Sequence, residues 1–255
     1  MNRIEDFPLL VLAFSFLGMW LSARIGRFIC RKQGAGEIEG SKDFSIIMSA
    51  ILTLLSLIIG FSFSMAVNRY DLRKNCEEEE ANSIGTEYLR ADFLPAGDAA
   101  RVRALLRDYL DQRILFYSAR VNRQLQQVNA TTAQQEIDLW AVVQAPATAR
   151  PTALVALTAS GMNGVLNSQG YTQAAWLNRI PGEAWVLMAV IAIFCNLMIG
   201  YGSHRAAVKG ILFLVIPLVV SISFFFIADI DSPRRGVIRV SPVNLVNLSQ
   251  SLQSH

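Results

Sequence analysis

A run of 24 residues without a charged side chain, at positions 44–67, constrains this chain more than any other feature. At about 1.5 Å per residue, a helix of that length is more than enough to cross roughly 30 Å of hydrocarbon. The composition agrees, because 53% of the residues are hydrophobic and only 17% are charged, an imbalance larger than soluble domains of this size show. The run therefore predicts a membrane-spanning helix and argues against a wholly water-soluble protein.

Three further apolar segments are long enough to span a bilayer. The first covers residues 8–23 and reaches full length if it continues to about Cys30 with Arg24 and Arg27 extended toward the headgroups. A signal peptide is disfavoured there, since Glu5 and Asp6 cancel the usual positive start and no small-residue cleavage site follows. The other two segments, residues 184–201 and 210–228, form a second hairpin. We predict an all-α integral membrane protein with four transmembrane helices.

These spans divide the chain into a first hairpin at 1–68, a helical extramembrane region at 69–182, a second hairpin at 183–230 and a tail at 231–255. The second span is expected to continue as a helix until just before Pro95, and three further helices are expected at 98–129, 132–145 and 153–176. An even number of spans places both termini and residues 69–182 on one side of the membrane. The basic residues flanking the spans do not favour either side.

Several classes of chemistry lack the residues they need. The two histidines are His204, in a short loop, and His255, at the last position, so no histidine-based zinc site or catalytic triad can be assembled. The three cysteines are far apart and predict no disulfide framework. Residues 69–181 carry 12 basic and 12 acidic side chains, which gives no electrostatic footprint for nucleic acid. We expect neither an enzyme nor a cofactor, and any metal remains unknown.

A stripe of small and polar residues follows the second span at spacings of three or four. On a helix this spacing places the residues along one face, where they can line a water-filled path in an oligomer or provide a seam that lets helix backbones approach each other. The sequence leaves both interpretations open. The stripe consists of Ser45, Ser49, Thr53, Ser56, Gly60, Ser64 and Asn68.

Two charged segments lie beyond the spans. Glu77, Glu78, Glu79 and Glu80 either form a solvated face paired with Arg73 and Lys74, or a cation-attracting mouth or hard-cation site assembled across subunits. After the fourth span, Asp229, Asp231, Arg234 and Arg235 predict either a salt-bridged corner or an interfacial anchor to lipid phosphates.

Four motifs together resemble the bacterial bestrophin-like domain family over residues 40–250. They are Gly-Phe-Ser-Phe-Ser-Met-Ala at 60–66, Asn-Arg-Tyr-Asp at 68–71, Glu-Ala-Asn-Ser-Ile-Gly-Thr-Glu-Tyr at 80–88 and Asp-Ile-Asp-Ser-Pro-Arg-Arg-Gly at 229–236. Bestrophins are pentameric anion channels with four spans, of which the second lines the pore. The resemblance implies a homo-oligomer in the lipid bilayer of a bacterial plasma (inner) membrane, with inorganic ions as partners and the acidic run near the soluble mouth of the pore.

The sequence therefore leaves two hypotheses about function. The first is an oligomeric ion channel lined by the second span. The second is a non-conducting membrane scaffold or sensor whose helical soluble region binds a partner.

Overall fold

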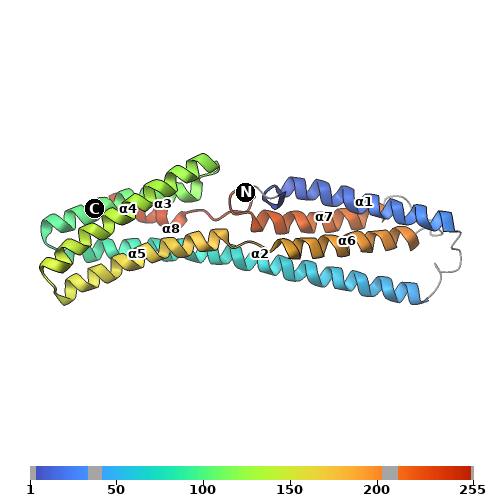
Figure 1. The fold of residues 1–255 in the computed structure, drawn as a ribbon, viewed down its shortest axis with the longest axis horizontal. Coiled ribbons are helices and arrows are strands. Elements are labelled where there is room, and N and C mark those ends of the chain that lie inside the picture. Colours follow the sequence, from blue (N-terminus) through green and yellow to red (C-terminus); the bar gives the residue numbers. More distant parts are fainter. Residues whose placement is uncertain (1–3, 34–41, 203–211, 254–255) are drawn as a thin grey trace. The chain divides into compact units, whose positions relative to one another are not determined.

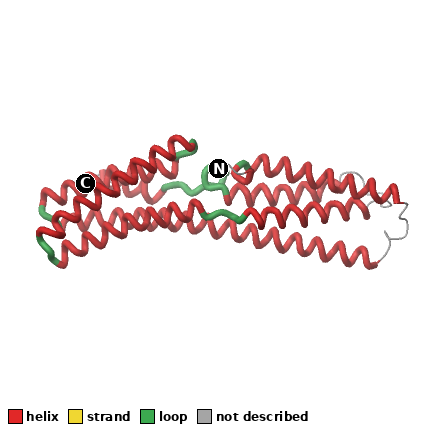
Figure 2. Tube along the Cα trace, in the orientation of Figure 1, coloured by secondary structure: helices red, strands yellow, loops and turns green. Residues whose placement is uncertain are grey.

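The computed structural model describes residues 4–33, 42–202 and 212–253. In these ranges the chain is all helical and contains no strand, as the apolar runs and helical periodicities predict (Figure 2). The contacts divide it into two compact units. Unit 1 comprises residues 1–69 and 179–239, and unit 2 comprises residues 70–178 and 240–255.

Unit 1 contains the helices α1 (Pro8–Gln33), α6 (Gly182–Gly202) and α7 (Leu212–Asp231), together with the beginning of α2. α1 packs along both α6 and α7. The α1–α6 seam is very close: a β-carbon at Gly200 would collide with the Ala23 carbonyl, and one at Gly26 would collide with the Leu197 carbonyl. Small residues that allow backbones to touch are typical of helix packing inside membranes.

Four helical segments of the described chain are long and apolar enough to cross a membrane. They are Pro8–Lys32, Asp43–Phe93, Ala153–Gly202 and Phe213–Asp231. Each contains one of the four predicted spans.

α2 (Lys42–Arg90) is one uninterrupted helix of 49 residues (Figure 1). It contains the uncharged run and continues past it, as the absence of a strong helix breaker before Pro95 predicts. The helix ends in a short 3-10 turn, η3 (Ala91–Phe93). α2 therefore begins in unit 1 and supplies residues 70–90 to unit 2.

Unit 2 adds α3 (Ala96–Ser118), α4 (Asn122–Ala149), α5 (Ala153–Leu177) and the C-terminal helix α8 (Val243–Gln253). α3 packs against α4, α4 packs against α5, and α8 packs against α3. The core is built from large side chains contributed by every one of these helices. Fully buried members include Ile84, Val102, Leu106, Leu139, Met162 and Leu245.

Two of the helices predicted in unit 2 have the wrong bounds. The helix expected at 98–129 breaks after Ser118, because Ala119 and Val121 adopt extended backbone and let α4 turn back onto α3. Thr132, where the next helix was expected to begin, is buried in the middle of α4, and Pro146, before which that helix was expected to end, lies within its last turns. The α3–α4 turn contains neither glycine nor proline, so local sequence gave no signal for it. α5, by contrast, covers the range predicted for it.

Candidate functional site

All seven residues of the predicted stripe on α2 are exposed in the single subunit. The opposite face of the helix is the one that packs, since Leu55, Ser62 and Ala66 are buried. Ser56 and Gly60 also border a cavity of about 540 Å³ that α2 shares with α7. Apart from the cavity that Ser56 and Gly60 share with α7, the stripe is open to contact with water, lipid or another chain.

Two stripe hydroxyls are already committed to the backbone of their own helix. Thr53 Oγ1 donates to the Ser49 carbonyl at 2.8 Å, and Ser56 Oγ donates to the Leu52 carbonyl at 2.9 Å. A hydroxyl that has given its proton to a carbonyl can offer its surroundings only oxygen lone pairs. These positions therefore present acceptors to whatever lies against the stripe.

The polar face does not end at Asn68, where the sequence analysis stopped. The same spacings of three or four continue to the end of α2, and every added position is exposed except Arg90, which is half-buried. The spacing is visible in the sequence, but it extends beyond the end of the apolar run at Val67, and the predicted stripe ended there. We call the whole set the polar line; beyond Asn68 its members are Asp71, Asn75, Glu79, Asn82, Thr86 and Arg90.

The structure separates the four consecutive glutamates into two pairs. Glu77 is buried and receives the start of α8: the Leu245 amide donates to its Oε1 at 3.0 Å, and Asn244 Nδ2 donates to its Oε2 at 2.7 Å. Its carboxylate thereby satisfies a backbone donor in the first turn of α8, where negative charge is favourable. Glu77 therefore docks the C-terminal helix.

Glu80 lies at the centre of a buried polar network in unit 2. It forms an ion pair with Arg113, and both side chains are fully buried. The Tyr117 and Thr172 hydroxyls each donate to Glu80 Oε2 at 3.2 Å. Burial would lower the pKa of Arg113, but the Glu80 carboxylate raises it overall, and burial raises the pKa of Tyr117. Glu80 thus holds α2, α3 and α5 together.

Glu78 and Glu79 remain exposed and border a polar cavity of about 470 Å³. The rest of its wall is formed by amide and hydroxyl side chains of α2, by Arg90, and by the small residues Ser160, Gly161 and Gly164 of α5. Of the predicted acidic mouth, only these two carboxylates can therefore meet a solvated ion.

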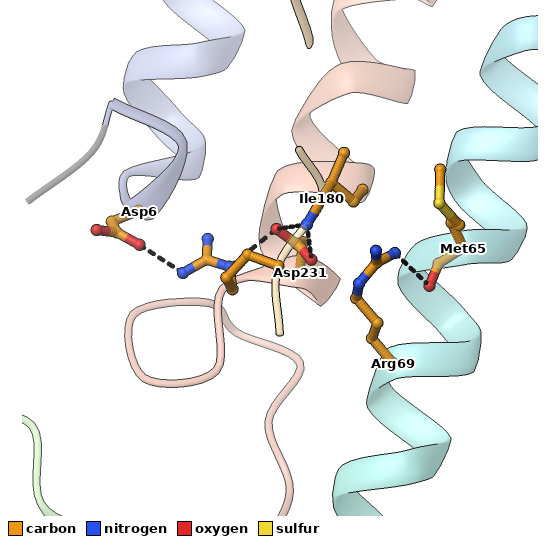
Figure 3. Close-up of polar contacts among 6 residues, drawn as sticks. Asp6, Met65, Arg69, Ile180 and Asp231 are labelled. Atoms are coloured by element: carbon orange, nitrogen blue, oxygen red, sulfur yellow. Dashed lines mark hydrogen bonds and ion pairs between the residues drawn. The ribbon is translucent and has the colours of Figure 1, made fainter. Parts of the chain in front are cut away.

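Asp229 and Asp231, the acidic residues that end α7, are buried and hydrogen-bonded within unit 1; Figure 3 shows the contacts of Asp231. Asp231 accepts from Arg179 Nε at 2.9 Å and from the Ile180 amide at 3.2 Å, while Arg179 Nη1 donates to Asp6 at 2.7 Å. Asp229 accepts from the amides of Val237 and Ile238 at 2.7 and 2.8 Å. The sequence analysis missed Arg179, which lies far from these acids in the chain.

The two arginines of the same motif have less buried positions. Arg234 is half-buried, and Arg235 is exposed with its guanidinium 4.3 Å from the centre of the Phe7 ring. This is a cation–π contact at the start of α1. The ion pair that connects α7 to Asp6 therefore runs through Arg179.

The described residues contain no group of three or more histidine, cysteine or acidic side chains that could hold a metal ion. His204 and His255 lie outside the described residues. All three cysteines are buried and free.

Comparison with known proteins agrees with this architecture. A family model described as a Bestrophin-like domain matches residues 9–245. No curated protein matches the chain significantly.

Solved structures of a bacterial bestrophin homologue share the fold. One point mutant of the homologue from Klebsiella pneumoniae superimposes with a TM-score of 0.68 at 12% identity, covering 97% of this chain and 98% of that one. A second structure of the homologue from Klebsiella pneumoniae gives a TM-score of 0.66 at 13% identity, covering 96% and 97%. With the family model matching almost its whole length, the chain belongs to the bestrophin-like domain family of membrane proteins.

Proposed function

We propose that this chain forms a homo-oligomeric ion-conducting pore in the bacterial inner membrane, with the polar line of α2 facing the conduction path. The observation that carries the proposal is the exposure of all seven stripe residues on a helix whose opposite face is packed. Thr53 and Ser56 satisfy their hydroxyl protons within the helix, but their lone pairs and the other polar groups of the spanning part of α2 gain partners where the line meets water. The fold shared with bestrophin homologues supports the proposal.

The favoured ion is a cation. Thr53 and Ser56 donate their protons to their own helix and turn lone pairs outward, which suits a partly dehydrated cation. Further along the polar line, Asp71 and Glu79 are exposed carboxylates that attract positive charge. Within this proposal no residue has a catalytic role.

Current through planar bilayers tests the proposal. Purified oligomer should conduct, and the reversal potential in a KCl gradient should lie toward the potassium equilibrium potential. Ser56→Leu and Ser64→Leu each replace a small polar group on the line by a bulky apolar one and should lower the conductance at least severalfold. Leu54→Val, at an exposed apolar position off the line, is the matched control and should conduct as the parent does.

The alternative is a non-conducting scaffold in which the stripe of one subunit packs against the next. The parent would then pass no ions. Both leucine variants would instead change the oligomeric state, measured by light scattering in detergent. A well-folded oligomer that is silent in bilayers would reject the channel and favour the scaffold.

A further inference from the structure

Glu87 is a buried carboxyl group that the polar line does not use. Its side chain is 0% exposed on the soluble part of α2, about 30 Å beyond the end of the uncharged run at 1.5 Å per residue. Neither of its oxygens accepts a hydrogen bond from any described residue. A buried ionised carboxylate without donors is unfavourable, so this position favours the protonated acid.

The carboxyl group fits here because α5 has no side chain at the point of contact. A β-carbon at Gly161 would collide with Glu87 Oε2 and with Arg90 Nη1, so both groups meet over the bare α-carbon of Gly161. The Thr158 hydroxyl donates to the Arg90 carbonyl at 3.2 Å and fixes the end of α2 to α5. Arg90 and Glu87 are thus held as neighbours at one place in unit 2.

The two residues differ in what they can reach. Arg90 borders the cavity of about 470 Å³ and belongs to the polar line, whereas Glu87 lies behind the cavity wall. Glu78 and Glu79 border the same cavity about three turns before Arg90 on α2. A change of charge on Glu87 therefore acts on the cavity through Arg90.

Burial raises the pKa of Glu87 to about 8, and the positive charge of Arg90 offsets only part of that rise. On α2, Arg90 is the charged group that acts on it, and α5 presents the uncharged Gly161 and Thr158. On η3, Asp92 is exposed and ion-paired with Arg103.

We propose that Glu87 and Arg90 form a proton-controlled charge at the soluble end of the polar line. With Glu87 protonated, the full positive charge of Arg90 acts on the cavity; with Glu87 ionised, the neighbouring carboxylate compensates it. The inference deepens the proposed function: cation conductance rises with pH, because deprotonation of Glu87 removes a positive barrier.

The first test follows the proton and does not depend on conduction. Difference infrared spectroscopy on the full-length protein in detergent should show a protonated-carboxyl band that disappears as the pH rises through about 8. Glu87→Gln should remove that band. Burial also raises the pKa of Glu136, so Glu136→Gln is the control and should keep the band. A band that survives in Glu87→Gln would overturn the assignment.

The second test measures cation current in bilayers between pH 6 and 9.5. Parent current should rise by about two- to fivefold across this range, the size expected for one partly screened charge per subunit. Glu87→Gln should stay at the low-pH level without pH dependence. Arg90→Gln lacks the positive charge and should already conduct at or above the parent's high-pH level at pH 6; any remaining rise should occur at higher pH, because Arg90 no longer lowers the pKa of Glu87. Asp92→Asn, which removes an exposed acid outside the cavity, should titrate like the parent.

The outcomes separate the two proposals. A parent-like rise in Glu87→Gln current would overturn the charge pair while leaving the channel intact. Silent bilayers for every variant would overturn the channel, and the infrared titration would still decide whether Glu87 carries the proton.

Discussion

The two units solve the same problem of packing helices in different ways. In unit 1, α1 and α6 touch backbone to backbone at Gly26 and Gly200. In unit 2, helices are held apart by large side chains and joined through a buried ion pair, Glu80 with Arg113. Lipid offers little hydrophobic driving force between helices, so close contact matters most in unit 1, whereas unit 2 gains from removing apolar side chains from water. Substitutions should therefore destabilise the two units for different physical reasons.

The largest effect is expected at the α1–α6 seam. Gly200→Leu would drive a side chain into the Ala23 carbonyl and should cost more than about 3 kcal/mol, enough to remove most folded protein. Gly18→Leu is the matched control on α1, because nothing lies within 4 Å of a β-carbon there. The measurement is the yield of monodisperse protein and its thermal midpoint in detergent. Equal damage from both variants would contradict seam packing in unit 1.

A smaller but still severe effect is expected from the buried ion pair of unit 2. Glu80→Ala leaves the Arg113 guanidinium buried without its carboxylate and should destabilise the protein by about 3–5 kcal/mol. Glu79→Ala, one residue away but exposed, should stay within about 0.5 kcal/mol of the parent. Thermal unfolding of the two variants gives the comparison.

The same network can be tested by apolar replacement. Because the desolvation of two charges offsets much of their attraction, Glu80→Leu combined with Arg113→Met should recover a large part of the loss. A double variant as unstable as Glu80→Ala would show that the hydrogen bonds from Tyr117 and Thr172 contribute more than the charge balance.

The smallest effect is expected at the junction of α2 and α8. Glu77→Ala removes two hydrogen bonds and should cost about 1–2 kcal/mol, confined to the C-terminal helix. Hydrogen exchange should show faster amide exchange in α8 while α3 and α4 stay protected. Glu78→Ala, with an exposed side chain, should leave α8 as in the parent; faster exchange there too would argue against the specific role of Glu77.

The sequence predicted the membrane architecture well because long apolar runs and missing breakers are local signals. α2 and α5 match their predicted extents, whereas the turn at Ala119 depends on α4 finding α3 and has no local marker. The burial of Glu80 could likewise not be predicted from the acidic run, because its partners Arg113 and Thr172 lie 33 and 92 residues away in the chain. The small-residue stripe could be read directly, but which side of α2 was already packed could not.

The unbroken course of α2 has a consequence for how this chain can change length. Each residue turns the helix by about 100°, so one inserted residue near Asn68 would rotate the later half of the polar line away from the earlier half. An insertion of 11 residues, close to three whole turns, would restore the alignment. The number of residues in α2 is therefore constrained as well as its side chains, because it decides which positions stay on the side away from the buried residues.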